Sequence, residues 1–273
     1  MRIVSILLGL AIATTGMAQT SFTPTLRQGM VKNYELVSDL TTSSDRQNAK
    51  AAIKVDSRME VGQVAADSVV MSYTYTSCDI TGSPAMQKVA ESYKVMLNKP
   101  IRFSVNPDGS FRHLLNASEI MGGLSDEAKQ IAADFANDEG FKSVLDQALI
   151  TILFGKTIKS GDKMSYSPGG LFNIERDFTS VKDKEVVFKD ETNMTEDALK
   201  ETFRKVLEKN GADVSNFDST WSMVKSMGIA EVKLESHGRL LMGDDNWLVS
   251  GETEQTTEQF GISMTARAKI TQK

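Results

Sequence analysis

Alternation of apolar and polar residues is the commonest pattern along this chain. Its clearest case is the segment 260–270, about eleven residues long. The apolar positions are Phe260, Ile262, Met264, Ala266, Ala268 and Ile270, and the polar ones between them are Ser263, Thr265, Arg267 and Lys269. A period of two residues predicts a strand with one face on a core and the other in water.

Similar alternation predicts strands in other parts of the chain. It recurs over 69–75 and, less regularly, over 30–40. Further strands are expected within 172–181, 185–191, 230–242 and 247–252, and Gly243-Asp244-Asp245-Asn246 is typical of the turn between the last two.

A β-hairpin is predicted at 101–115. Two apolar-alternating runs flank Asn106-Pro107-Asp108-Gly109, in which proline fixes the first turn position and Gly109 can adopt a positive φ. A regular second strand would place Phe111, His113 and Leu115 on the same face. His113 is therefore expected in the core or at its rim.

Helical periodicity appears in two inserts between the strands. Ser125 is a good N-cap for a helix over 125–135, and apolar residues from Phe141 to Ile152 form a wide stripe on a second helix. A third helix is expected from Thr195 to Asn210-Gly211, where a left-handed terminus is natural, and a short fourth over 217–224.

This order of elements predicts an α+β fold. Strands are not separated by regular helical crossovers, so the sheet should be antiparallel and curved, half-barrel-like, with the helical inserts packed on one face. No Pro/Ser-rich linker divides the chain, so 19–273 is expected to be a single domain, with 22–160 and 161–273 as its possible halves.

The first residues resemble a secretory signal peptide. Arg2 precedes an apolar run of about eleven residues, which is shorter than the roughly 20 that a membrane span needs. Small residues at 16 and 18 predict cleavage between Ala18 and Gln19. The mature protein is therefore expected in the periplasm, at the outer membrane or outside the cell, with no transmembrane segment.

Charge and cysteine content narrow the possible partners. The net charge is −5 and lysines are interspersed with glutamates, so no basic face for nucleic acid is expected. Cys78 is the only cysteine, so an intramolecular disulfide is impossible and apolar burial must stabilise the fold.

No catalytic motif stands out. His113 and His237 are the only histidines, neither has a metal-ligand spacing, and His237 precedes Gly238 at an expected strand break. Ser222 and Lys225 have the spacing of penicillin-recognising enzymes, but the Lys-Thr-Gly partner is missing. The sequence predicts no enzyme, no metal site and no cofactor.

Several short motifs resemble uncharacterised secreted bacterial proteins. They are Gly29 with Tyr34, Leu97-Asn98-Lys99-Pro100-Ile101 leading to Pro107-Asp108-Gly109, and Gly155-Lys156-Thr157-Ile158 leading to Gly161-Asp162-Lys163. Met164 or Tyr166 stands where those proteins usually have tryptophan. Their fold is similar to the periplasmic lipoprotein carriers (LolA-like), which implies a half-open barrel around an apolar cavity and no catalytic centre.

The resulting functional hypothesis is a cell-envelope protein that binds or carries a lipid or other apolar ligand between sheet and helices. Its pocket candidates are Tyr73, Tyr75, Phe103, Phe111, Val144 and Ala148. The competing interpretation is that these side chains fill a dry core. Two other functions remain open: a structural or surface-assembly protein with an envelope protein partner, and a hydrolase that uses carboxylates or His113.

Overall fold

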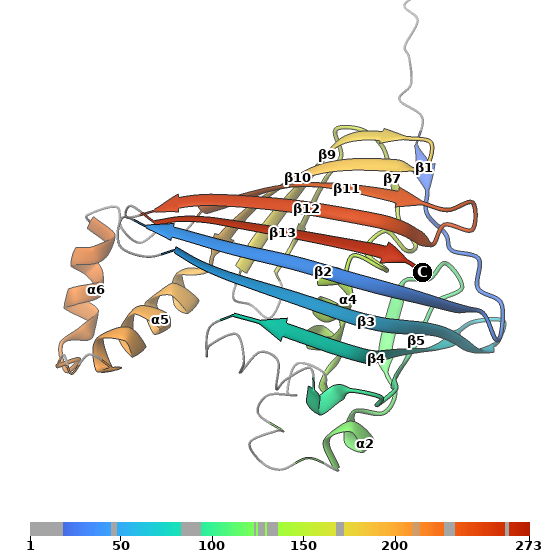
Figure 1. The fold of residues 1–273 in the computed structure, drawn as a ribbon, viewed down its shortest axis with the longest axis horizontal. Helices are drawn as coiled ribbons and strands as arrows, with labels where there is room; N and C mark the ends of the chain where they lie inside the picture. The colour runs from blue at the N-terminus through green and yellow to red at the C-terminus, as the bar shows by residue number, and fades with distance from the viewer. Residues whose placement is uncertain are drawn as a thin grey trace, which may run out of the picture.

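A single antiparallel sheet dominates the molecule (Figure 1). The computed structural model describes residues 19–44, 48–82, 94–122, 124, 129, 136–167, 172–209, 211, 213–226, 233–259 and 262–273. The signal-peptide-like segment 1–18 and nearly all of the predicted helix 125–135 lie outside them.

The sheet consists of two meanders joined by one pairing. The first contains β2 (Val31–Ser44), β3 (Asn48–Val64), β4 (Val69–Thr81), β5 (Ile101–Val105) and β6 (Phe111–Leu114). The second contains β8 (Lys163–Tyr166), β9 (Phe172–Lys182), β10 (Glu185–Met194), β11 (Lys233–Met242), β12 (Leu248–Gln259) and β13 (Ile262–Gln272). The pairing of β2 with β13 joins them, so the sheet is continuous from β6 to β8 and curved but unclosed (Figure 1).

The predicted strand at the C-terminal end is confirmed. In β13 the side chains of Arg267 and Lys269 are exposed, whereas Ile270 is buried. The predicted strands at 30–40, 69–75, 172–181, 185–191, 230–242 and 247–252 correspond to β2, β4, β9, β10, β11 and β12. The fold class is therefore supported as a mainly antiparallel sheet with a few helices.

The predicted hairpin is present, but its second strand has a different register. Gly109 has the expected positive φ of 89°. A bulge then shifts the pairing, so that Phe111 opposes Val105 and Leu114 opposes Phe103. The extra residue turns His113 outward, where 69% of its side chain is exposed, so the predicted core position of His113 is wrong.

Helix α4 (Asp138–Gln147) packs on the inner face of the sheet. Its N-cap Asn137 accepts a hydrogen bond from the Gly140 amide, as an N-cap side chain should. The prediction of a helix up to Ile152 is wrong, because Leu149 has a positive φ of 61° and the chain continues in turns. These turns still carry buried apolar side chains into the core.

The main core lies between α4, the turns that follow it and one half of the sheet. Tyr34, Met59, Phe103, Phe141 and Trp247 are each 0% exposed. The turn segment also pairs with the N-terminal part of the described chain, because β1 (Thr20–Ser21) and β7 (Thr157–Ile158) form a two-stranded sheet. The other half of the sheet extends beyond this core.

Two further helices lie at that other end (Figure 1). They are α5 (Glu196–Lys209) and α6 (Phe217–Ser226), both close to the predicted ranges. Phe203 contacts Phe217 and Trp221, with ring centroids 6.2 Å apart in each case, and forms a small cluster separate from the main core. A short helix, α2 (Ala117–Gly122), follows β6. Within the described residues no helix has the length and apolar character of a membrane span.

Gly238 lies in the middle of β11, which continues without the expected strand break. A neighbouring aromatic ring leaves no room for a side chain at this position. A Cβ atom on Gly238 would lie 2.1 Å from the ring of Phe188, which is fully buried on the adjacent strand. The Arg176 guanidinium carbon lies 3.8 Å from the centroid of the same ring. The ring is therefore packed closely against both Gly238 and the Arg176 guanidinium.

We expect Gly238→Ala to lower the free energy of unfolding by about 2 kcal/mol, because overpacking displaces a buried ring. Urea denaturation would measure the change. Adding Phe188→Leu to Gly238→Ala should recover part of the loss, since a smaller side chain leaves room for the new methyl group. Unchanged stability of the single variant would contradict the steric explanation.

Candidate functional site

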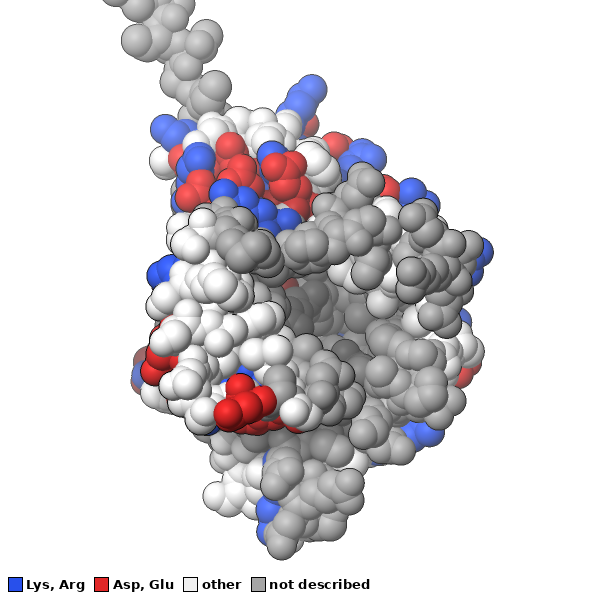
Figure 2. Space-filling view, turned by 90° about the vertical axis from the view of Figure 1, so that its left-hand side faces the viewer, with Lys and Arg blue, Asp and Glu red and all other residues white. Residues whose placement is uncertain are grey.

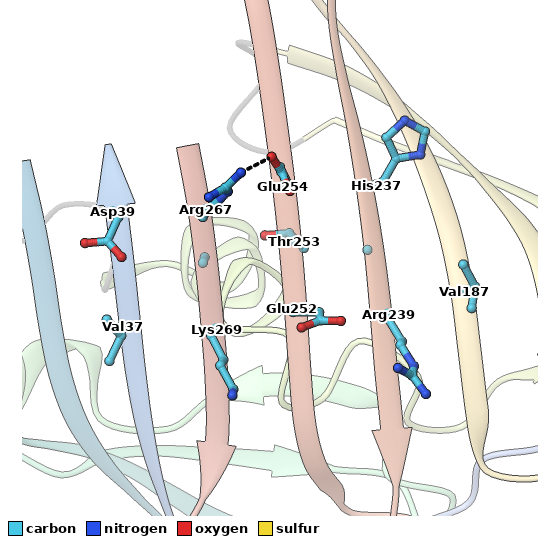
Figure 3. Close-up of a pocket in the computed structure, with 12 residues that line it drawn as sticks. Val37, Asp39, Val187, His237, Arg239, Glu252, Thr253, Glu254, Arg267 and Lys269 are labelled. Atoms are coloured by element: carbon cyan, nitrogen blue, oxygen red, sulfur yellow. Dashed lines mark hydrogen bonds and ion pairs between the residues drawn. The ribbon is translucent and has the colours of Figure 1, made fainter. Parts of the chain in front are cut away.

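A trough of about 660 Å³ crosses the outer face of the sheet (Figure 3). Its floor is formed by Gly238, Thr253 and Ala268, which are neighbours across three strands. Two parallel rows of outward side chains form its walls. One row is Val187, Arg239, Glu252, Lys269 and Val37, and the other is His237, Glu254, Arg267 and Asp39.

The charges on these walls largely compensate one another. Arg267 donates a hydrogen bond of 2.8 Å to Glu254 across the strands (Figure 3). Arg239 pairs with Glu185 at 2.9 Å. Exposed pairs of this kind contribute little stability, and alternating signs give no net attraction for a charged ligand. The trough is therefore a solvated outer surface of the sheet.

The pocket candidates from the sequence lie together on the inner side, mostly as packed core. Tyr73, Tyr75 and Phe103 are at most 4% exposed, and Ala148 is buried at the end of α4. The Tyr73 and Tyr75 rings meet edge to face at 4.9 Å. Phe103 is 5.2 Å from the ring of Phe141 on α4. The remaining candidates, Phe111 and Val144, are partly buried against the same core.

A small cavity of about 130 Å³ remains between α4 and the sheet. Phe103 and Phe111 line it, together with Leu145, Phe154 and Lys156. Its volume is well below the roughly 300 to 1,000 Å³ of typical small-molecule pockets. Between α4 and the sheet, a larger ligand would therefore need to extend beyond this cavity.

The inner face continues past the core as a surface that is only partly covered. One row of inward positions crosses seven strands in register, from β9 to β3. Its members are Arg176, Asp190, Ser236, Gln255, Ala266, Leu40 and Ala51. At about 4.8 Å per strand, this row spans roughly 29 Å along the curve. It is charged at the β9 end and apolar at the β3 end.

The apolar end of this row is part of a wider apolar area. Leu40 and Ala266 are register partners with intermediate exposure. Ile53, Ile80 and Met264 extend the area on the same face, and each is also incompletely buried. Figure 2 faces the end of the molecule at which α5 and α6 lie, and it shows acidic and basic side chains next to one another on the described surface.

The charged end of the row is a buried ion pair. Arg176 donates two hydrogen bonds to Asp190, of 2.7 Å from Nε and 2.6 Å from Nη2, and the two side chains are only 3% and 9% exposed. Nη2 also donates to the Tyr166 hydroxyl at 3.2 Å. The Nη1 atom of Arg176 is buried and has no hydrogen-bond partner in the part of the chain that the structure describes. An unsatisfied buried donor is unfavourable.

Lys156 lies next to this pair on the inner side. Its Nζ atom contacts the Met164 sulfur at 2.7 Å, and Met164 is the register partner of Arg176. Burial lowers the pKa of Lys156 from 10.5 to about 8, and the nearby Lys142 and Arg176 charges act in the same direction against Asp146. Burial likewise raises the pKa of Tyr166 to about 12. In this cluster Arg176 and Lys156 can only donate hydrogen bonds, and the Asp190 carboxylate can only accept them.

The two histidines do not share a site. Nδ1 of His113 is 3.1 Å from Asp138 on the exposed edge of the sheet, and His237 lies on the outer trough. The Leu114 amide and His113 together lower the pKa of Asp138. Among the described residues, no group of three or more acidic, histidine or cysteine side chains could hold a metal ion.

No binding role was predicted from the sequence for Arg176, Asp190, Tyr166 or Lys156, although Lys156 and Tyr166 occur in the motifs that resemble secreted bacterial proteins. A signal existed, however. In the predicted strands, Arg176 alternates with Ile174 and Phe178, so a charged residue occupies an inward position. Such a residue must find a partner of opposite charge on a neighbouring strand. Asp190 occupies the corresponding inward position of β10.

Comparisons with known proteins give no family assignment. No family model matches the sequence, and no curated protein matches it. Among solved structures, lipovitellin, studied for its lipid–protein interactions, is 9% identical, with a TM-score of 0.42 over 91% of this chain and 25% of its own. This chain therefore corresponds to about a quarter of lipovitellin.

Two bacterial structures are also similar at a low level. An outer membrane channel from Pseudomonas putida is 6% identical, with a TM-score of 0.21 over 92% of this chain and 98% of its own. A protein of a domain-of-unknown-function family from Desulfovibrio piger is 7% identical, with a TM-score of 0.14 over 86% and 83%. None of these values defines a shared family or a shared site.

Proposed function

We propose that this protein is a non-catalytic component of the bacterial cell envelope that binds an apolar or amphipathic ligand on the inner face of its sheet. The envelope location rests on the signal-peptide-like sequence of residues 1–18. The binding function rests on the geometry of the sheet.

The observation that carries the proposal is the incompletely covered apolar area on the inner face. Leu40, Ile80 and Met264 point to the same side as the fully buried core residues, yet they remain partly exposed. Large apolar side chains on a concave surface are energetically costly in water, and a ligand that covers them would gain about 25 cal/mol for each Å² removed from solvent. The aromatic pocket candidates lie on the same face, in the core next to this surface.

A charge on this surface should weaken ligand binding strongly. We expect Leu40→Glu to weaken the binding of the fluorescent apolar probe 1-N-phenylnaphthylamine at least tenfold, because the carboxylate keeps its water shell inside the groove. Fluorescence titration of the purified protein measures the change.

The matched control is the neighbouring residue on the same strand. Thr41 is exposed and points to the opposite face, so Thr41→Glu adds the same charge and should leave the affinity unchanged. Extraction and mass spectrometry of the protein purified from bacterial envelopes should also identify a bound lipid with the unsubstituted chain. Absence of both probe binding and copurified lipid would contradict the proposal.

A further inference from the structure

Hydrogen-bond donors exceed acceptors in the buried cluster at the charged end of the inward row. Arg176 has five N–H groups, and the bonds to Asp190 and Tyr166 use those on Nε and Nη2. Among the described residues, the two on Nη1 have no hydrogen-bond partner. The hydrogen-bond contact of the Lys156 ammonium within this part of the chain is to a thioether, which is a weak acceptor.

The cluster also carries an excess of positive charge. Asp190 compensates Arg176 in a two-bond pair. Asp146, the other nearby carboxylate, forms its own ion pair with Lys142 at 2.5 Å. When Lys156 is protonated, one positive charge therefore remains uncompensated beside the pair. Burying such a charge is unfavourable unless an anion accompanies it.

We propose that Lys156 and Arg176 anchor the anionic headgroup, a carboxylate or a phosphate, of an amphiphile whose chain extends along the inward row toward its apolar end. This inference rests on the proposed function and adds the chemistry of the ligand. An oxyanion supplies the acceptors that the cluster lacks and balances its remaining charge.

The arrangement of the inner face fits this orientation. Ser236 and Gln255 separate the charged pair from Ala266 and Leu40 in the same row, so polarity falls continuously from β9 to β2. Lys156 also lines the small cavity beside α4. The headgroup position therefore borders the cavity and belongs to the same inward row as the uncovered apolar area.

Calorimetric titration with three twelve-carbon ligands tests the inference. Dodecanoate and dodecyl phosphate carry the two headgroups, and dodecan-1-ol provides the same chain without charge. We expect the full-length mature protein to bind at least one anion about tenfold more tightly than the alcohol. The anion that binds with the higher affinity identifies the headgroup.

Lys156→Met should remove this preference, so that the variant binds the two anions no more tightly than it binds dodecan-1-ol. The matched control is Lys163→Met, which removes an exposed lysine of β8 that pairs with Glu175; it should preserve the preference. The double replacement Arg176→Met/Asp190→Leu removes both charges of the pair together with the Arg176 donors, and it should also reduce anion binding.

The outcomes separate the two proposals. Equal affinity for the alcohol and both anions would overturn the headgroup anchor and leave the apolar groove intact. Loss of alcohol and anion binding to the same extent in Lys156→Met would also overturn it, because Lys156 would then act only through the shape of the site. Failure of all three ligands to bind the unsubstituted protein would overturn the proposed function as well.

Discussion

Asp190→Ala is expected to lower the free energy of unfolding by about 3–5 kcal/mol, the largest effect of any single change considered for this protein. The substitution leaves the Arg176 guanidinium buried, with its two carboxylate hydrogen bonds lost and only the Tyr166 hydroxyl remaining. Chemical denaturation, monitored by the fluorescence of the buried Trp247, measures the loss.

The double variant Arg176→Met/Asp190→Leu shows whether the loss of stability in Asp190→Ala comes from an unpaired buried charge or from lost side-chain contacts. Because it removes both charges together, its stability should lie close to that of the unsubstituted protein. Glu191→Ala is the control on the same strand, since Glu191 is exposed and should change stability by less than about 0.5 kcal/mol. A stable Asp190→Ala variant would show that water or a rearranged chain satisfies Arg176.

Lys156→Met is expected to stabilise the protein at pH 7, and its advantage should shrink by about 3 kcal/mol between pH 7 and pH 10.5. The folded-state pKa of Lys156 is lowered from 10.5 to about 8. Between these values the unfolded chain holds a proton that the folded chain has released. Raising the pH therefore stabilises the unsubstituted protein relative to the variant.

Urea denaturation of both proteins at pH 7, 9 and 10.5 measures this difference, and subtraction cancels groups that titrate alike in the two chains. Lys163→Met is again the control: Glu175 raises the pKa of the exposed Lys163, so no such narrowing is expected with it. A difference that is constant over this pH range would mean that Lys156 remains protonated in the folded protein.

Most strands were predictable because each alternates over a long stretch. The strand β3 was not predicted, although Val55, Met59 and Val61 alternate with charged residues. Ser57 interrupts its apolar face and is nevertheless buried, because the large ring of Tyr34 lies opposite it across β2 and β3. Complementary sizes on neighbouring strands are visible only once the register is known.

Two sequence predictions, the facing of His113 and the length of the helix that contains Phe141, were wrong for the same reason. Periodicity does not show where a strand or helix is interrupted. The bulge opposite Ser104 inserts one residue and reverses the facing of His113. After Gln147, apolar residues continue with helical spacing, yet Leu149 adopts a left-handed conformation and the segment packs as turns. In both places tertiary packing decides the local structure.

The candidate site was predictable only in its apolar part. The aromatic residues were found because strand alternation places them on the core side, as with Tyr73 and Phe103. The Arg176–Asp190 pair depends on the contact between two strands, and Lys156 reaches it from a turn. How much of the inner face is open likewise depends on how far α4 extends over the sheet, and sequence periodicity overestimated the length of α4.

The pairing of β2 with β13 has a consequence for how the chain folds. Every other pairing in the sheet joins strands that follow one another in sequence, so each meander can assemble through local contacts. In the finished sheet the outermost strands, β6 and β8, have only four residues each. Until β2 and β13 pair with each other, however, each of these strands, of 14 and 11 residues, has an unpaired edge. The half-assembled chain is therefore the state most prone to self-association, and a chaperone that covers these two edges would protect it best.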